Sequence, residues 1–290
     1  MSLTLTSRDR LVDYAFRAGW AVTRHAPEEV SARVLENAAD RMWRRRTKGV
    51  VQLEANLRRA RPDADEAALR ALSQQALRSY FRYWHEAFRM STWSAGRIVD
   101  SVVTTNEAAQ KETFAEGNGG IIALPHMANW DHAGAWACLT GRPVSAVAER
   151  LRPDSLFDQF VAYREELGME IVALTGAENA LTAMEDALAR RRLVCLLADR
   201  DLTRSGAEVT LLGEQATLPT GAAVLAQRTG APLIAMTLRY RGPLMHVVFS
   251  DPVEVRPGRD GAVAMTQDIA DHFSLGIRAA PYDWHMLQRV

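Results

Sequence analysis

The sequence has few of the features that mark disulfide-linked, exported or membrane-spanning proteins. Only two of the 290 residues are cysteine, and both stand in apolar runs, so they predict buried thiols in a reducing compartment and no disulfide framework. No run of about 18 apolar residues occurs, which excludes a predicted transmembrane helix. Charged residues such as Arg8, Asp9 and Arg10 interrupt the beginning of the chain, so we expect no signal peptide.

Neither sign of charge dominates, with 35 basic and 35 acidic residues, which excludes a nucleic-acid partner attracted by overall charge. Lysine is also scarce, since Lys48 and Lys111 are the only two and arginine supplies the other basic residues. Any attraction to an anionic membrane surface therefore has to be local. The densest positive run, from Arg44 to Lys48, fits either contact with lipid headgroups, worth about 1 kcal/mol per charge near the surface, or a solvated helix end.

The first hundred residues have helical periodicity. In the first of these segments, Phe16 and Trp20 recur on an apolar face among arginines, so it predicts an amphipathic helix. That face either covers the core or lies in a membrane interface, where tryptophan and arginine are common. The predicted helices cover residues 7–25, 28–46, 49–59 and 64–88, with proline or glycine between them.

From about residue 102 the pattern changes to short apolar runs that alternate with helical segments. Runs that are apolar on both faces are typical of parallel strands covered by helices on each side. The sequence therefore predicts one α/β domain over residues 1–290, with a helical region at 1–100 and a core at 101–290. The strand candidates are GGIIALPH, RPVSAVAE, MEIVALTG, RRLVCLLAD, APLIAMTLRY and LMHVVFSDPVEV, and the helices are 154–167, 177–190 and 221–228.

The best candidate site follows the predicted strand at residues 121–124, where ligands of open α/β sheets usually bind. His126 stands at the start of a helix, whose positive dipole end disfavours the imidazolium, so it is suited to act as a neutral base. Asp131 follows five positions later, and we expect its carboxylate to contact one ring nitrogen while the other faces the substrate.

Other kinds of site lack support in the sequence. There is no G-x-S-x-G motif and neither cysteine has basic neighbours, so no covalent nucleophile is indicated. His126, Asp131 and His132 could suggest a metal centre, but adjacent helical residues point apart and no H-E-x-x-H or paired-cysteine motif occurs. The glycines at 117–120 precede a strand, which does not fit a dinucleotide cradle. We therefore expect neither a metal nor a cofactor.

Several segments resemble the lysophospholipid acyltransferase superfamily, with its H-x4-D arrangement after a helical N-terminal third. Within it the chain is similar to the bacterial lipid A acyltransferase branch, and more closely to the actinobacterial phosphatidylinositol mannoside acyltransferases. The segments that carry the resemblance are Arg46 through Asn56-Leu57, His126 to Asp131, Ala148-Glu149-Arg150, Tyr163-Arg164, Ala198 to Asp201, Leu218 to Ala223, and Pro281 to Leu287. The resemblance implies a glycerol-3-phosphate acyltransferase-like fold.

The sequence also departs from the glycerolipid acyltransferases. Pro125 stands where those enzymes place an asparagine before the histidine, and no E-G-T-R block occurs. Where those enzymes have the E-G-T-R block, after a strand, this sequence has the triplet Asp199-Arg200-Asp201. In this it resembles the branch that acylates glycolipids. These departures make a glycerol-phosphate acceptor less fitting than a sugar hydroxyl.

The resemblance implies acyl-CoA or acyl carrier protein as the donor of a long-chain acyl group such as palmitoyl, and a mannose of a phosphatidylinositol mannoside as the acceptor. His126 would take the proton from the sugar hydroxyl, and Asp131 would orient it. Polar contacts to the substrate are implied for Glu149, Arg164, Asp199 and Arg200, which without the resemblance would be read as surface or ion-paired residues. Arginine suits a lipid phosphate because its planar fork can bind two oxygens.

Such an enzyme would sit peripherally on the cytoplasmic face of the membrane. Two alternatives remain open from the sequence. One is a lipid thioesterase or hydrolase in which His126 and Asp131 activate water. The other is a lipid-binding protein without chemistry.

Overall fold

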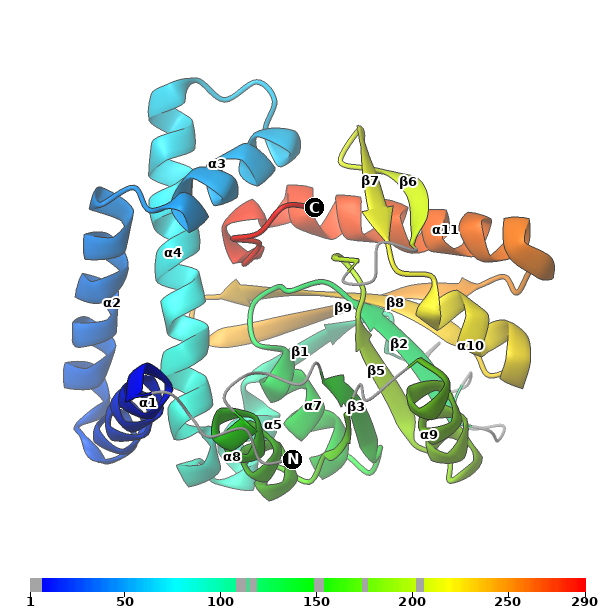
Figure 1. Ribbon diagram of the computed structural model, residues 1–290, viewed down its shortest axis with the longest axis horizontal. Helices are drawn as coiled ribbons and strands as arrows, with labels where there is room; N and C mark the ends of the chain where they lie inside the picture. Colours follow the sequence, from blue (N-terminus) through cyan, green and yellow to red (C-terminus); the bar gives the residue numbers. More distant parts are fainter. Residues whose placement is uncertain (1–6, 108–113, 115–118, 149–153, 174–176, 202–205) are drawn as a thin grey trace.

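The computed structural model describes residues 7–107, 114, 119–148, 154–173, 177–201 and 206–290. Its N-terminal part is helical, as predicted, and stands at one side of the molecule (Figure 1). The predicted helices end within a few residues of the observed ones. These are α1 (Ser7–His25), α2 (Glu28–Arg44), α3 (Lys48–Ala60) and α4 (Glu66–Arg89).

Helix α4 is the centre of this region. It begins at Asp65, whose side chain accepts a hydrogen bond from the Ala68 N–H at 2.7 Å and so satisfies a free amide of the first turn. Against it, Leu53 and Leu57 of α3 pack with Leu77 in a small core that excludes solvent completely. Helices α3 and α4 are thereby held together by apolar burial.

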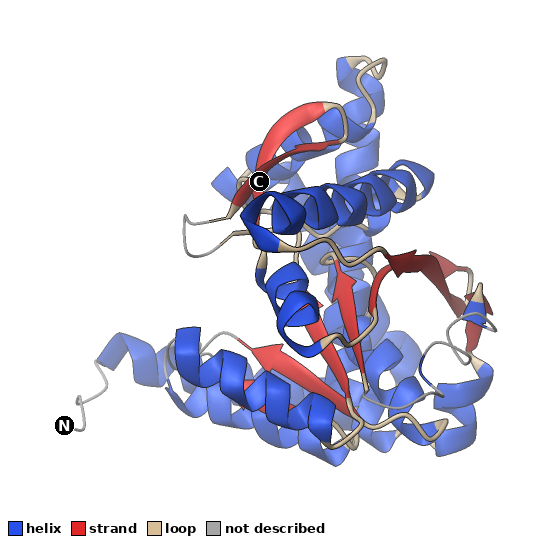
Figure 2. Ribbon diagram, turned by 90° about the vertical axis from the view of Figure 1, so that its right-hand side faces the viewer, coloured by secondary structure: helices blue, strands red, loops and turns tan. Residues whose placement is uncertain are grey.

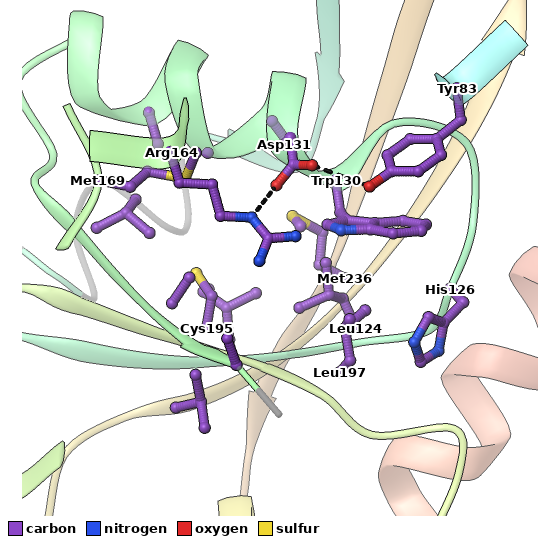
Figure 3. Close-up of a pocket in the computed structure, with 18 of the residues that line it drawn as sticks. Tyr83, Leu124, His126, Trp130, Asp131, Arg164, Met169, Cys195, Leu197 and Met236 are labelled. Carbon is purple, nitrogen blue, oxygen red and sulfur yellow. Dashed lines mark hydrogen bonds and ion pairs between the residues drawn. The ribbon is translucent and has the colours of Figure 1, made fainter. Parts of the chain in front are cut away.

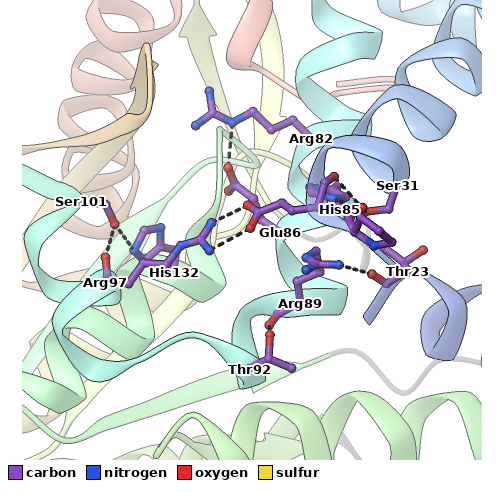
Figure 4. Close-up of polar contacts among 12 residues, drawn as sticks. Thr23, Ser31, Arg82, His85, Glu86, Arg89, Thr92, Arg97, Ser101 and His132 are labelled. Carbon is purple, nitrogen blue, oxygen red and sulfur yellow. Dashed lines mark hydrogen bonds and ion pairs between the residues drawn. The ribbon is translucent and has the colours of Figure 1, made fainter. Parts of the chain in front are cut away.

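Polar contacts join α4 to α1 and α2 (Figure 4). His85 Nε2 lies 2.9 Å from the hydroxyl of Ser31 on α2. Arg89 donates to the carbonyl oxygens of Thr23 and Ala26, at 2.5 and 2.7 Å, at the end of α1. A cation that binds the last carbonyls of a helix satisfies acceptors that the helix itself leaves open. Arg89 therefore fixes the C-terminal end of α1 against α4.

The core of the protein is a seven-stranded sheet in the order β1-β9-β8-β2-β5-β3-β4. Every neighbouring pair is parallel except β8 and β9, so β1 and β9 run opposite to the other strands. All six predicted runs are strands of this sheet, which confirms the α/β, largely parallel prediction. The strands are β1 (Val102–Thr105), β2 (Gly120–Leu124), β3 (Val144–Ala148), β4 (Glu170–Ala173), β5 (Leu193–Leu197), β8 (Leu233–Arg241) and β9 (Leu244–Val253).

Helices cover both faces of the sheet (Figures 1 and 2). The crossovers from β2 to β3 and from β3 to β4 run one way along the sheet, and those from β4 to β5 and from β5 to β8 run back. When each crossover is right-handed, the two sets of helices lie on opposite faces. On one side lie α5 (Ala95–Asp100), α7 (Trp130–Leu139) and α8 (Asp154–Glu166), and on the other lie α9 (Ala177–Ala189), α10 (Gly221–Thr229) and α11 (Gly258–Ala279).

The periodicity did not predict α5, α11, or a separate antiparallel hairpin of β6 (Ala207–Leu211) and β7 (Glu214–Leu218). Helix α11 contains three glycines, which weaken a helical signal. One of them, Gly276, permits close packing, because a Cβ there would lie 2.5 Å from the side chain of Thr237 on β8. After α11, a short 3-10 helix η2 (Pro281–Asp283) leads the chain back across the sheet edge where β2 and β5 end.

Candidate active site

The candidate base and a carboxylate meet at the ends of two neighbouring strands. Leu124 of β2 is paired with Leu197 of the parallel strand β5, and two residues beyond each lie His126 and Asp199. The His126 Nδ1 and the Asp199 Oδ1 are 2.6 Å apart. The backbone N–H of His126 also donates to the Asp199 Oδ2 at 2.9 Å. Strand register therefore joins residues that are 73 positions apart.

The predicted contact between Asp131 and His126 is wrong. Asn129 caps α7 by accepting the His132 N–H at 2.9 Å, and before it the chain turns through Ala128, which has a φ of 43° in the left-handed region. After this turn, Trp130 packs edge-on against the His126 ring with centroids 5.4 Å apart, whereas Asp131 forms its hydrogen bonds elsewhere.

In the observed arrangement, Asp131 Oδ1 accepts a hydrogen bond from Arg164 Nε at 2.7 Å, and Oδ2 accepts one from the Tyr83 hydroxyl at 3.0 Å. The three residues come from α7, α8 and α4. The histidine nitrogen that we assigned to Asp131 belongs to Asp199.

Asp199 is fully buried and accepts a third hydrogen bond, from the indole Nε1 of Trp284 to Oδ2 at 2.9 Å. Burial alone raises the pKa of this carboxyl, but the charge of His126 and the hydrogen bonds from His126 and Trp284 outweigh it and hold the pKa below its ordinary value. Asp199 is therefore ionised at neutral pH and accepts the Nδ1 proton. This fixes the His126 tautomer, with Nε2 free to accept a proton from a ligand.

His126 stands at one end of a cavity of about 340 Å³, and its side chain is 26% exposed. Most of the lining is apolar, and Figure 3 shows many of these side chains. Gly134 leaves room for Met169, because a Cβ there would lie 2.4 Å from the Met169 sulfur. Apolar lining residues are Ile122, Leu124, Met169, Leu193, Leu197, Met236 and Phe249. A cavity of this kind suits an aliphatic chain.

The inner wall of the cavity carries the polar group around Arg164. Burial disfavours its charge, but Asp131 and Tyr83 raise the pKa of Arg164 above its ordinary value, so it is a permanent cation. Burial raises the pKa of Tyr83 well above the usual range, so its hydroxyl remains a donor to Asp131. Trp130 stacks on Tyr83 with ring centroids 4.2 Å apart, and in Figure 3 it lies between Arg164 and His126.

A second buried network supports the loop behind His126. The Glu86 carboxylate on α4 accepts hydrogen bonds from the Asn129 amide at 2.9 Å and the Tyr240 hydroxyl at 2.9 Å, and from Arg82 Nε at 2.7 Å. Asn129 thus caps α7 with one end of its amide and contacts α4 with the other. The N-terminus of α7 is thereby fixed to the helical region.

Five of the six predicted site residues lie at one cavity. His126, Arg164 and Arg200 line it, and Asp199 lies beside it in contact with His126. Asp131 also lines it, through its contact with Arg164. Glu149 lies outside the described residues. The roles assigned to all six stay predictions.

Sequence reasoning missed Tyr83, Trp130, Trp284 and His285, which line the cavity or hold Asp199. Aromatic residues in apolar helices are usually interpreted as packing residues, and Trp284 lies in the segment from Pro281 to Leu287, for which the resemblance implied no contact. One signal was available for Asp199: it follows an apolar run by the same two residues as His126.

Two further properties concern metals and membranes. Among the described residues, no group of three or more histidine, cysteine, aspartate or glutamate side chains could hold a metal ion. His132 is turned away from His126, since its Nε2 lies 2.9 Å from the Ile98 carbonyl oxygen. Within the described part of the chain, each helix is too short or too polar to span a bilayer.

Comparison with known proteins finds similarity along almost the whole chain. Residues 3–290 match the family model described as bacterial lipid A biosynthesis acyltransferase. A phosphatidylinositol mannoside acyltransferase of Mycolicibacterium smegmatis is 37% identical over 293 residues, which covers 99% of this chain and 94% of that protein. A protein of the same name from Mycobacterium tuberculosis H37Rv is 37% identical over 280 residues, covering 95% of this chain and 87% of its own length.

Proposed function

Because this chain belongs to the bacterial lipid A biosynthesis acyltransferase family, we propose that it is a peripheral membrane enzyme that transfers a fatty acyl group to a glycolipid. The donor is acyl-CoA carrying a long chain, probed best with palmitoyl. The acceptor is a mannose hydroxyl of a phosphatidylinositol mannoside, the lipid class in the names of the mycobacterial relatives.

The observation that carries this proposal is the hydrogen bond between His126 Nδ1 and Asp199 at the mouth of an apolar cavity. An imidazole whose Nδ1 proton is held by a carboxylate can accept a proton at Nε2, and the carboxylate then stabilises the imidazolium. The cavity beside it accommodates the aliphatic part of the donor. Acyl transfer to a hydroxyl requires a base that lies next to a cavity for the acyl chain.

The proposed step is direct attack without an enzyme-bound acyl intermediate. His126 takes the proton from the acceptor hydroxyl as its oxygen attacks the thioester carbonyl carbon. The tetrahedral adduct collapses, the carbon–sulfur bond breaks, and the imidazolium returns its proton to the leaving thiolate. Neither cysteine competes as a nucleophile: burial raises the pKa of Cys195 to about 12 and also raises that of Cys138.

Features of the helical region support a membrane-facing surface. Val22 at the end of α1 and Val30 and Val34 on α2 are exposed, although valine is usually buried. The basic run from Arg44 to Lys48 is exposed between α2 and α3. Exposed apolar residues and a cationic segment, here toward the start and the end of α2, are both features of surfaces that bind anionic bilayers, and the proposed location is the cytoplasmic face.

The test incubates the purified protein with radiolabelled palmitoyl-CoA and vesicles that contain a phosphatidylinositol mannoside. We expect label in the mannosylated lipid with the unaltered protein, and loss of at least about a thousandfold in rate with His126→Ala. His25→Ala is the matched control, because His25 is exposed at the end of α1, away from the cavity. It should transfer at the normal rate.

Each other outcome has a distinct meaning. Label released only as free fatty acid would replace the transferase with a thioesterase that activates water. Transfer that survives His126→Ala would remove His126 from the role of base. Vesicle binding without consumption of palmitoyl-CoA would leave only a lipid-binding function.

A further inference from the structure

The segment after α11 crosses directly over the loop that carries His126. Met127 and Trp284 form an antiparallel bridge. On either side of it, the Ala128 N–H donates to the Asp283 carbonyl at 2.9 Å, and the His285 N–H donates to the His126 carbonyl at 2.8 Å. Residues 283–288, called the C-terminal strap below, thus hold both sides of the histidine loop, residues 125–129.

The strap is itself fixed to three separate elements. The amide nitrogen of Asn56 on α3 donates to the carbonyl oxygens of Met286 at 2.8 Å and Gln288 at 2.7 Å. The side chain of Asp283 accepts the Ser79 hydroxyl of α4 at 2.6 Å and the Tyr240 N–H of β8 at 2.7 Å. A segment with so many buried polar contacts has one defined position relative to the sheet.

Trp284 connects the strap to the reacting pair. Its side chain is completely buried, and its N–H donates to the Asp199 Oδ2, which also receives the backbone N–H of His126. The last torsion of an aspartate side chain has a broad energy minimum, so the carboxylate needs outside contacts to fix its plane. Two donors on Oδ2 leave Oδ1 aimed at Nδ1.

We propose that Trp284 is a positioning residue for acyl transfer, whose indole N–H holds the Asp199 carboxylate in the plane that orients His126. This inference rests on the proposed function, because it assigns Trp284 a part in the action of that same base. The strap makes the position of the indole independent of the substrate. Asp199 then requires no rearrangement when His126 takes up a proton.

Loss of the indole N–H has two predictable effects. The carboxylate gains rotational freedom, so His126 is oriented less well and kcat falls by about tenfold, while KM for acyl-CoA stays unchanged. A carboxylate with one donor fewer also stabilises the imidazolium more strongly. The acid limb of the pH–rate profile therefore moves up, by about half a pH unit, because a higher pH is needed to keep the base neutral.

The experiment compares Trp284→Phe with Trp93→Phe in the full chain. Trp93 is a matched control because its indole nitrogen is also buried but has no acceptor, and it packs edge-on against His132 instead of the reacting pair. Trp284→Phe should show the lower kcat and the shifted limb, and Trp93→Phe should show neither. Equal losses in both variants would overturn the proposal.

Because Trp284→Phe could fail to fold, a second replacement puts 3-benzothienylalanine at position 284, which keeps the shape of the ring and lacks the N–H. The same loss and shift are expected. Wild-type kcat and an unmoved acid limb in this protein would reduce Trp284 to a packing residue.

A measurement without substrate separates this inference from the proposed function. The short His126–Asp199 hydrogen bond is expected to give a low-field proton resonance for the Nδ1 proton. The resonance should move or disappear when position 284 lacks the N–H and persist in Trp93→Phe. An unchanged resonance would overturn the inference and leave the proposed function standing, whereas transfer surviving His126→Ala would remove the base on which both depend.

Discussion

The cavity has two acidic side chains with opposite kinds of partner. At the mouth, Asp199 is bound to His126, whose imidazole has a second nitrogen that can accept a proton. On the inner wall, Asp131 is bound to Arg164, whose charge is permanent. Only the first pair can follow a proton through a reaction. The second pair keeps a buried cation compensated, so we expect its contribution to be structural and positional.

The two pairs also show that hydrogen-bond partners depend on strand order more than on distance along the chain. Asp131 is near His126 in the chain, but the capped start of α7 separates them. Asp199 is distant in the chain, but β2 and β5 are neighbours and end in register. In a parallel sheet, the residues that follow neighbouring strands meet more readily than residues a few positions apart across a turn.

The largest expected effect comes from breaking the pair at the mouth. Asp199→Asn preserves size but removes the charge that fixes the His126 tautomer, so kcat should fall by about a thousandfold or more. Initial rates of palmitoyl transfer at saturating donor would measure it. Asp268→Asn, in a partly exposed ion pair with Arg256, is the control and should keep the normal rate. A loss under tenfold for Asp199→Asn would contradict the role of this pair.

The second largest effect is expected from breaking the Asp131–Arg164 pair. Asp131→Asn leaves Arg164, whose side chain is 17% exposed, without its carboxylate, so the free energy of unfolding should fall by about 3 kcal/mol. The decrease in kcat should be smaller than for Asp199→Asn. Urea unfolding and initial rates would measure the two quantities. A kcat as low as that of Asp199→Asn would instead support the catalytic role that the sequence assigned to Asp131.

A double variant sharpens this prediction. When Arg164→Gln is added to Asp131→Asn, no uncompensated buried charge remains, so the double variant should be more stable than the sum of the two single losses predicts, by about 2 kcal/mol. Additive losses would show that the two side chains do not stabilise each other.

The smallest effect concerns a second histidine at the mouth. Burial, with the nearby charge of His126, lowers the pKa of His285 to about 3 from the ordinary 6.5. Because the unfolded chain binds the proton first, the stability from neutral His285 is present above pH 6.5 and is lost as the pH falls toward 3. Between pH 7 and pH 5 this loss amounts to about 2 kcal/mol.

His285→Gln should remove that component, so its unfolding free energy should change less than that of the unaltered protein between these pH values. Urea unfolding at pH 7 and pH 5 measures it, with exposed His25→Gln as the control. If His285→Gln kept the full pH dependence, the histidine would not be held neutral in the folded state.

The sequence predicted most of the fold. The helices of the first hundred residues and six of the seven sheet strands follow from periodicity, because burial of an apolar face imposes a fixed spacing on a helix or strand. Helix α11 was missed because its three glycines, of which Gly276 packs against Thr237 on β8, dilute the apolar pattern. The hairpin of β6 and β7 was missed because its exposed positions carry glutamate, glutamine and threonine.

The site was predicted in part. His126 follows an apolar run and precedes a helix, a pattern that local sequence can reveal. Its partner could not be chosen, because chain distance favoured Asp131 and no periodicity states which strands are neighbours. Trp284 carried even less signal, since its contact with Asp199 depends on where the chain returns after α11.

By itself the sequence determined the order of helices and strands, the absence of a covalent nucleophile motif, and the position of the candidate base after a buried strand. Tertiary structure alone decided that Asp199 forms the hydrogen bond with His126, that Asp131 compensates Arg164, and that the C-terminal strap holds the histidine loop. The physical reason is that periodicity records local burial. Hydrogen-bond partners are fixed only when separate elements pack, because each contact depends on strand order and register.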